Sequence, residues 1–391
     1  MSSNKKVQSK FDYQLAFILF LLFCCSCIAI YGAQLTSAQY AEQNFLIKQI
    51  VWYVVGSFII AGVMLFDSEQ IQRMAWYLYG LGVFLLVLLM VAPHSIARPI
   101  NGAKAWFTLP GFSFQPSEFM KGFLIIALSS IIAKHNQKYV KRTLSSDILL
   151  LFKIIGTALL PILLVLEQPD LGTALVLMAI VAGLIFVSGI SWKIITVISA
   201  LITTVVSTIL YLVIFAPDIL IKYLRVEQYQ LGRIYAWLNP EGYKTDEAYH
   251  LINSLKAIGS GQIMGKGLGE AQVYIPENHT DFIFSVIGEQ FGFIGTSIVL
   301  SIYFLLIYHL IKVSIETNEE FNSYICAGVI SLFVFHVFQN SGMTIGLLPI
   351  TGIPLPFISY GGSSIMGSMF AIGLIFSIRW HHKVYMFSDD K

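Results

Sequence analysis

The sequence predicts an all-α, polytopic membrane protein. Of its 391 residues, 56% are hydrophobic and 12% are charged, whereas a soluble domain carries roughly 25% charged residues. Lys and Arg number 24 against 22 Asp and Glu, so the basic excess typical of nucleic-acid binders is missing. The composition therefore excludes a soluble domain and a nucleic-acid-binding protein. It also excludes a disordered chain, because disorder needs low hydrophobicity.

Apolar runs that can cross a bilayer, or nearly so, recur along the chain. They lie at about 13–33, 45–66, 74–93, 117–133, 148–166, 171–190, 194–215, 282–310, 323–341 and 364–380. They predict about ten transmembrane helices in a single membrane domain over residues 1–391. The first run follows basic residues but exceeds a typical signal-peptide core, so we expect an uncleaved first span.

Lys and Arg are distributed unevenly between the runs. On the side of the N-terminus lie Lys5, Lys6, Lys10, Arg73, Lys134, Lys138, Lys141, Arg142, Lys153, Lys193, Lys312, Arg379, Lys383 and Lys391. The short segments on the other side hold Lys48, Arg98, Lys104 and Lys121. Because basic residues favour cytoplasmic loops, both termini are predicted to be cytoplasmic in a multi-pass protein of the cell membrane.

The segment 216–281 is the main exception to the apolar composition. It is charged, it contains a Gly-rich stretch at 257–270, and it falls on the extracellular side between spans 7 and 8. An apolar pattern suited to a short interfacial helix is formed by Tyr249, Leu251, Ile252, Leu255 and Ile258. A loop longer than about 15 residues is usually functional or disordered, and the apolar content favours a large, ordered extracellular loop.

Ionisable residues cluster at the predicted outer ends of the spans. Pro116 is placed like a first-turn proline, and Glu118 and Lys121 share one helix face. Their spacing fits either an ion pair that lets two charges enter the membrane together or a charged cavity wall. Asp170 fits a helix N-cap as well as a site residue.

Two further segments extend this outer cluster. Residues 274–293 gather four ionisable side chains, but the spacing of His279 and Asp281 does not match a metal-binding helix. Residues 340–364 hold several prolines and glycines within an apolar stretch. Such backbone is tolerated at membrane depth only when buried in protein or lining a cavity, which would also suit a transporter.

Five of these motifs together resemble the SEDS family (shape, elongation, division and sporulation) of bacterial cell-wall polymerases, over essentially the whole chain. They read NGAKAWF, QPSEFMK, QPDLGTA, PENHTDFIF and NSGMTIGLLPITGIPLPFISYGGSS, in the family's order. The form PITGIPLPF is more similar to the elongation branch, RodA, than to the division branch, FtsW. The resemblance implies a peptidoglycan glycosyltransferase that polymerises lipid II on the outer face of the bacterial cytoplasmic membrane during cell elongation and cell-shape maintenance.

The resemblance also assigns candidate site residues. The aspartate of the HTDFIF-type motif is essential in the family, which makes Asp281 the candidate catalytic base. Trp106 matches a functionally sensitive tryptophan, and Glu118 and Lys121 match residues lining a central cavity. Further candidates for substrate binding or cavity positions are Asp170, His279, Ser359 and Gly361.

Glycosyl transfer from lipid II can proceed with a single carboxylate as the base. A sugar hydroxyl attacks an anomeric carbon while undecaprenyl diphosphate departs, and a diphosphate leaves without the second carboxyl group that glycosidases use as an acid. The leaving group needs positive charge, for which Lys121, Arg98, Lys104 or a divalent cation, Mg²⁺ or Mn²⁺, are the candidates. No metal ligands are identified.

Two alternatives remain open, a lipid II flippase or other transporter and a non-catalytic scaffold for a transpeptidase. A transporter predicts ionisable groups near the bilayer midplane, whereas here they lie mostly at outer span ends. The partners implied by the resemblance are a class B penicillin-binding protein, which supplies transpeptidation, and the elongation machinery.

Overall fold

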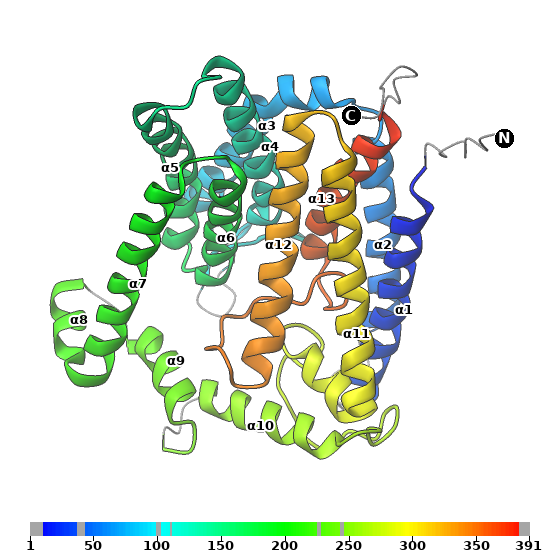
Figure 1. Ribbon diagram of the computed structural model, residues 1–391. Helices are drawn as coiled ribbons and strands as arrows, with labels where there is room; N and C mark the ends of the chain where they lie inside the picture. Colours follow the sequence, from blue (N-terminus) through cyan, green and yellow to red (C-terminus); the bar gives the residue numbers. More distant parts are fainter. Residues whose placement is uncertain are drawn as a thin grey trace, which may run out of the picture.

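The computed structural model describes residues 11–36, 44–98, 103–109, 112–224, 228–242 and 246–382. Most of them are helical (Figure 1). The helices that match the predicted spans are α1 (Tyr13–Leu35), α2 (Phe45–Val63), α3 (Ser68–Val91), α4 (Pro116–Lys138), α5 (Leu144–Glu167), α6 (Leu171–Val187), α7 (Trp192–Phe215), α11 (Ile283–Glu316), α12 (Glu320–Thr344) and α13 (Gly362–Trp380). This confirms the predicted all-α polytopic fold.

Nine of the helices in the described ranges are long and apolar enough to cross a membrane. The sixth predicted span is present as α6, but with 17 residues it is shorter than the others. The predicted run at 171–190 overshoots it, because Ser188 already caps its end and Gly189 follows in the left-handed region, with φ of +81°. A helix of this length is at the lower limit for spanning a bilayer.

Local sequence signals set several helix starts. Asp67 and Thr143 each form a capping box with the residue three positions on, at the starts of α3 and α5. Pro116 occupies the first turn of α4, where its missing N–H has no intrahelical partner to lose. Pro161 lies inside α5, and the helix continues through it.

A short β-hairpin precedes α4, although the sequence predicted only helices. Strands β1 (Phe107–Leu109) and β2 (Phe112–Phe114) pair antiparallel, with Phe107 opposite Phe114. Three residues per strand are too few to produce a clear alternating pattern among flanking apolar residues. The hairpin matters because it delivers the 103–106 segment to the site described below.

Helix α4 forms the centre of the bundle and α7 its periphery. In the most apolar 18-residue stretch of α4, 89% of the residues are buried, whereas the same share in α7 is 6%. Figure 1 shows α7 standing apart from the main bundle, on the left of the view. The buried position of α4 explains why Glu118 and Lys121, in its first two turns, face protein rather than lipid.

Helix α11 is longer than the predicted run at 282–310 and is broken near its start. Gly292 has φ of +62° and ψ of −156°, a conformation that side chains rarely adopt. A Cβ there would lie 2.5 Å from the backbone nitrogen of Gly265. The break therefore allows the Gly-rich stretch, which the sequence located at 257–270, to pack directly against α11.

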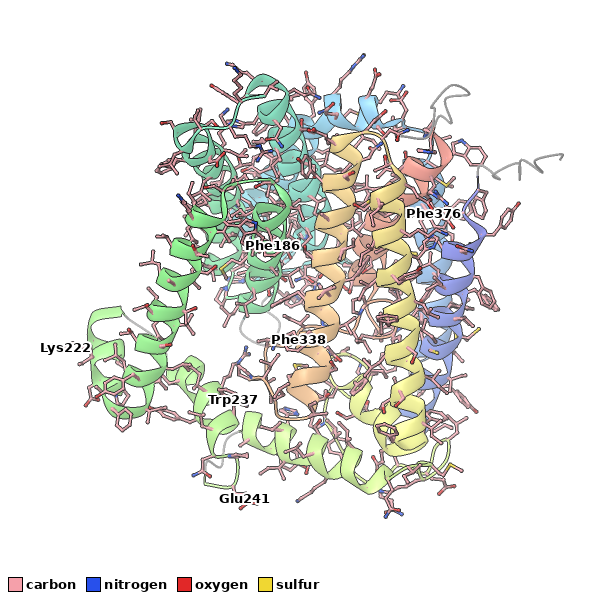
Figure 2. The ribbon with its side chains drawn as sticks, in the orientation of Figure 1. Phe186, Lys222, Trp237, Glu241, Phe338 and Phe376 are labelled. Atoms are coloured by element: carbon pink, nitrogen blue, oxygen red, sulfur yellow. The ribbon has the colours of Figure 1, made fainter. Side chains whose placement is uncertain are left out.

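The described parts of segment 216–281 form three further helices at one end of the bundle. These are α8 (Pro217–Leu224), α9 (Gln228–Leu238) and α10 (Asp246–Gly261), and α10 includes the predicted apolar pattern. Trp237 on α9 donates its indole N–H to the Gly346 carbonyl at 2.9 Å, which ties the segment to the loop after α12. Lys222 and Glu241 project away from the bundle (Figure 2).

The opposite end of the bundle carries the start of α1 and the end of α13. Phe11 stacks on Phe376 at 5.5 Å between ring centroids, and Asp12 lies 3.4 Å from Arg379. The first and last membrane helices therefore meet at one end of the bundle, while the cytoplasmic location of the termini stays a prediction. Of the basic residues used for that prediction, Lys5, Lys6, Lys10, Lys383 and Lys391 lie outside the described residues.

Candidate active site

A cavity of about 940 Å³ opens at the end of the bundle that faces the 216–281 segment. Segments far apart in sequence form its wall: the start of α2, the 106–118 region, the start of α6, the residues before α11 and the loop from α12 into α13. Its acidic lining residues are Glu118, Asp170, Glu277 and Asp281. Part of the cluster predicted from sequence, with Glu118, Asp170, Glu277 and Asp281, thus lines one concave site.

Asp281 reaches this cavity from the turn before α11 and is half-buried. Asn340 holds its backbone by donating to the carbonyls of Asp281 and Ile353, at 2.7 and 2.8 Å. Ser359 holds the preceding residue, since its hydroxyl donates to the Thr280 carbonyl at 2.7 Å. The buried loop after α12 therefore fixes the position of Asp281.

Gly352 in that loop lies against the Asp281 carboxylate. It has φ of +69°, and a Cβ there would lie 3.4 Å from Asp281 Oδ2. A side chain would be strained and would crowd the carboxylate. The sequence indicated that this Pro- and Gly-rich stretch is irregular and buried, and the structure shows both: Ile353, Leu355 and Phe357 are each 1% exposed.

The environment of Asp281 makes it a stronger base than an ordinary carboxylate. Burial raises its pKa from 3.8 to about 7, the nearby Glu277 and Asp170 carboxylates act in the same direction, and Arg233 opposes them. Hydrogen bonds from described residues reach the backbone of Asp281 but not its carboxylate. A base with a pKa near the working pH is well suited to proton transfer.

Glu118 and Lys121 form a buried ion pair at the cavity wall. Lys121 Nζ lies 2.7 Å from Glu118 Oε2, and the side chains are 4% and 6% exposed. Lys121 Nζ also lies 3.4 Å from Nε2 of His336. Glu118 lines the cavity and Lys121 lies behind it. The ion pair and the cavity wall, which the spacing left as alternatives, are therefore both present.

Asp170 is both a helix N-cap and a cavity residue, the two roles that the sequence left open. Its Oδ1 accepts from the Thr173 N–H at 3.0 Å, which caps α6. Its Oδ2 accepts from the Thr173 hydroxyl at 2.8 Å and from the Gln115 side chain at 2.9 Å. These bonds hold the start of α6 next to the segment that leads into α4.

The structure places other candidate residues differently. Trp106 and Gly361 line the cavity. Ser359 acts from the loop behind it, and His279 is buried between the rings of Phe45 and Tyr360, at centroid distances of 4.3 and 5.6 Å. Burial lowers the pKa of His279, which disfavours the charged form of its ring.

Two of the predicted diphosphate cations lie away from the cavity lining. Lys104 Nζ donates to the carbonyls of Met90 and Ala92, at 2.9 and 2.6 Å, and so satisfies the C-terminal end of α3. Arg98 is exposed in the turn after α3. Sequence spacing could not show that Lys104 binds the end of α3, because the C-terminus of a helix attracts a cation just as a diphosphate does.

Lys48 was not proposed from sequence as a site residue, yet it is the one basic side chain among the described residues that line the cavity. It lies in the first turn of α2, where the helix dipole also favours an anion. A signal was present in the sequence. Lys48 is one of few basic residues on the side that is otherwise poor in them.

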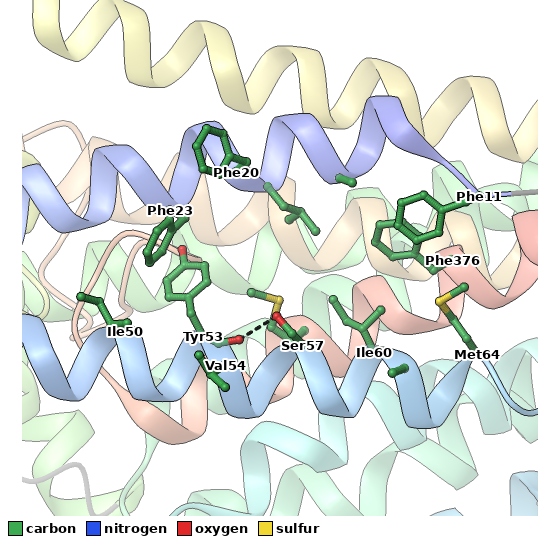
Figure 3. Close-up of a pocket in the computed structure, with 14 residues that line it drawn as sticks. Phe11, Phe20, Phe23, Ile50, Tyr53, Val54, Ser57, Ile60, Met64 and Phe376 are labelled. Atoms are coloured by element: carbon green, nitrogen blue, oxygen red, sulfur yellow. Dashed lines mark hydrogen bonds between the residues drawn. The ribbon is translucent and has the colours of Figure 1, made fainter. Parts of the chain in front are cut away.

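A second cavity, of about 460 Å³, lies between α1, α2 and α13 (Figure 3). Its wall includes Phe20, Phe23, Val54 and Ile60, and it has no acidic or basic lining residue. Its polar side chains are those of Tyr53 and Ser57, and it holds no carboxylate or cationic side chain for glycosyl transfer. The cavity around Asp281 is therefore the candidate active site.

A family model described as a cell cycle protein and named for FtsW, RodA and SpoVE matches residues 13–384. The chain belongs to this family. The resemblance to SEDS proteins inferred from the motifs is thereby confirmed.

Relatives across the FtsW/RodA/SpoVE family match at similar identity. The chain is 33% identical to the probable peptidoglycan glycosyltransferase FtsW of Trichlorobacter lovleyi, covering 95% of this chain and 93% of that protein. It is 30% identical to the peptidoglycan glycosyltransferase RodA of Treponema pallidum, covering 95% and 98%. It is also 30% identical to stage V sporulation protein E of Bacillus subtilis, covering 94% and 96%.

Solved structures of the family share the fold. The chain superposes on a member of a peptidoglycan synthase complex that coordinates polymerization and crosslinking, with a TM-score of 0.72, 27% identity and coverage of 97% of this chain and 99% of that one. RodA of Thermus thermophilus superposes with a TM-score of 0.67, 25% identity and coverage of 97% and 100%. The FtsW/RodA/SpoVE fold therefore extends over almost the whole chain.

Within the described residues of this family member, no group of three or more His, Cys, Asp or Glu side chains is placed to hold a metal ion. No step below is routed through a metal.

Proposed function

We propose that the chain polymerises lipid II into glycan strands on the outer face of the bacterial cytoplasmic membrane, during cell elongation and maintenance of cell shape. The chain is a peptidoglycan glycosyltransferase, as its curated relatives are. The observation that carries the finer proposal is Asp281, a carboxylate with a pKa of about 7 at the wall of a large cavity.

The proposed reaction assigns a role to two groups that line the cavity. The acceptor's 4-hydroxyl oxygen attacks the anomeric carbon of the donor, and the bond from that carbon to the diphosphate oxygen breaks. Asp281 accepts the hydroxyl proton, and undecaprenyl diphosphate leaves with the bonding electron pair. Lys48 and the first turn of α2 supply the positive charge that stabilises the diphosphate.

The same geometry favours an enzyme over a transporter or a scaffold. The charged lining residues sit at one end of the bundle, because Lys48 and Glu118 are in first helical turns and Asp170 is an N-cap. A transporter would need such groups near the midplane. A scaffold would need no carboxylate of raised pKa.

The deciding experiment incubates purified protein with lipid II and looks for polymer, and for translocation in sealed vesicles. Polymer without translocation is expected, and translocation without polymer would overturn the proposal.

The proposed partner is a class B penicillin-binding protein that supplies crosslinking, together with the elongation machinery. The match to a member of a synthase complex that coordinates polymerization and crosslinking supports it. The PITGIPLPF form supports elongation rather than division. Depletion of this chain should therefore round the cells rather than block septation, and cell shape under depletion tests it.

The activity should depend on pH through Asp281. The carboxylate accepts a proton only when ionised, so kcat/KM should rise with pH through about 7 and level off above it. A carboxylate with the ordinary pKa of 3.8 would be fully ionised above pH 5 and would give a flat profile there. Initial rates with labelled lipid II between pH 5 and 9 measure this profile.

Glu277→Gln should move the midpoint of the profile to lower pH, because the Glu277 charge helps to raise the pKa of Asp281. An unmoved midpoint would argue against Asp281 as the titrating group.

Lys48→Ala should lower kcat/KM about 10- to 100-fold, because one donor to developing charge is lost. The matched control is Lys104→Ala, whose ammonium binds the end of α3 instead of lining the cavity. The control should remain within about twofold of the wild type. If Lys104→Ala loses more activity than Lys48→Ala, with both proteins folded, Lys48 does not carry the diphosphate charge.

A further inference from the structure

A chain of buried polar groups runs from the cavity wall into the bundle. Glu118 Oε2 lies 2.7 Å from Lys121 Nζ. Lys121 Nζ lies 3.4 Å from His336 Nε2, and His336 Nδ1 lies 3.1 Å from the Pro354 carbonyl oxygen. His336 is on α12, 4% exposed, and nothing in the reaction described above uses it.

The partners of His336 determine which of its nitrogens carries the proton. The Pro354 carbonyl can only accept, so Nδ1 must carry the hydrogen and donate. The Lys121 ammonium can only donate, so Nε2 must be the unprotonated acceptor. One neutral tautomer satisfies both contacts, and its ring orientation is fixed by them.

His336 therefore connects two walls of the cavity. On one side Lys121 holds Glu118, which lines the cavity from α4. On the other side Pro354 lines the cavity from the loop after α12. The same loop carries Gly352, which lies against the Asp281 carboxylate. A shift of His336 would change the distance between the Glu118 wall and the catalytic base.

We propose that His336 is a positioning residue for glycosyl transfer, which holds the Lys121 ammonium at Glu118 and the Pro354 loop at Asp281. It acts through these residues and does not touch substrate. The inference rests on the proposed polymerase function. Misplacement of reacting groups by about 1 Å can reduce a rate 100-fold, so the position of His336 is expected to affect kcat more than KM.

The test compares three variants of the full-length protein. His336→Leu removes both contacts and should lower kcat for polymerisation of labelled lipid II about 10- to 100-fold, with KM changed by less than about threefold. His336→Gln carries one acceptor and one donor on its amide and should restore most of the activity. Should the Leu variant not reach the membrane, His336→Asn replaces it, because Asn keeps a donor near Pro354 but is too short to reach Lys121.

Gln339→Leu is the matched control. Gln339 is also on α12, is 6% exposed, and donates to the Pro349 carbonyl of the same loop at 3.0 Å, without a contact to Lys121. Coupling is tested in the double variant Glu118→Gln/Lys121→Met, where the ammonium is gone. There His336→Leu should have a smaller effect than in the wild type, because only its contact with Pro354 is left to lose, whereas Gln339→Leu should have the same effect as in the wild type.

The outcomes separate the inference from the function on which it rests. If wild-type protein makes no polymer, the proposed function fails, and the role of His336 fails with it. If the wild type makes polymer but His336→Leu or His336→Asn retains full kcat, the positioning role alone is overturned. It is also overturned if His336→Gln is no better than His336→Leu, or if the effect of His336→Leu persists unchanged without Lys121.

Discussion

Asp281→Asn is expected to abolish glycan polymerisation from purified lipid II, with a loss of about 10³-fold or more in kcat. Asn has the shape of Asp but cannot accept the proton of the attacking hydroxyl. The backbone bonds that hold the position, from Asn340 and Ser359, do not involve the replaced carboxylate. Membrane insertion and binding of the crosslinking partner should therefore remain.

The melting temperature provides the control for Asp281→Asn. The raised pKa means that ionising Asp281 in the folded protein is unfavourable, so its charge reduces stability at pH values above the unfolded pKa. The variant should melt at the same or a higher temperature at pH 8. Asp218→Asn on α8, exposed and far from the cavity lining, should leave activity unchanged. Normal polymer from folded Asp281→Asn protein would rule out Asp281 as the base.

Removal of Lys121 is expected to have the second-largest effect. Lys121→Ala leaves the Glu118 carboxylate buried without its partner, which costs about 3–5 kcal/mol of stability. Activity and membrane abundance should both fall, so the single variant cannot separate a structural role from a functional one. Burial of the pair, which spacing alone could not predict, makes a second variant necessary.

The double variant Glu118→Gln/Lys121→Met removes both charges together. Neutral replacement of a buried pair is often close to neutral for stability, so abundance and melting temperature should recover towards wild type. Polymerisation should remain about 100-fold below wild type, because the charged cavity wall is lost. Recovery of full activity along with abundance would show that the pair only allows two charges to enter the membrane.

Much of the architecture was predictable from local composition. All ten apolar runs are helices, and Pro116 and Asp170 begin helices where their residue types indicated. The irregular stretch after α12 was recognisable from its prolines and glycines. The motifs placed Trp106 and Asp281 in the same family site before any geometry was known.

Other features depended on contacts between distant segments. Lys104 and Lys48 are both basic residues of short segments that the sequence predicts to be extracellular, but of the two only Lys48 lines the cavity. Ser359 and His279 belong to the motifs yet act by packing and backbone bonds. His336 gave no sequence signal, because a single His on an apolar helix has no pattern of its own.

By itself, the sequence determined the helices, their approximate ends and the family. A membrane helix satisfies its backbone hydrogen bonds within its own segment, so a run of apolar residues is enough to predict it. Only the tertiary structure decided which charges meet. Glu118, Asp170 and Asp281 come from segments of the chain far apart in sequence. They come to line one cavity, and the pKa of Asp281 is raised, only when those helices pack together.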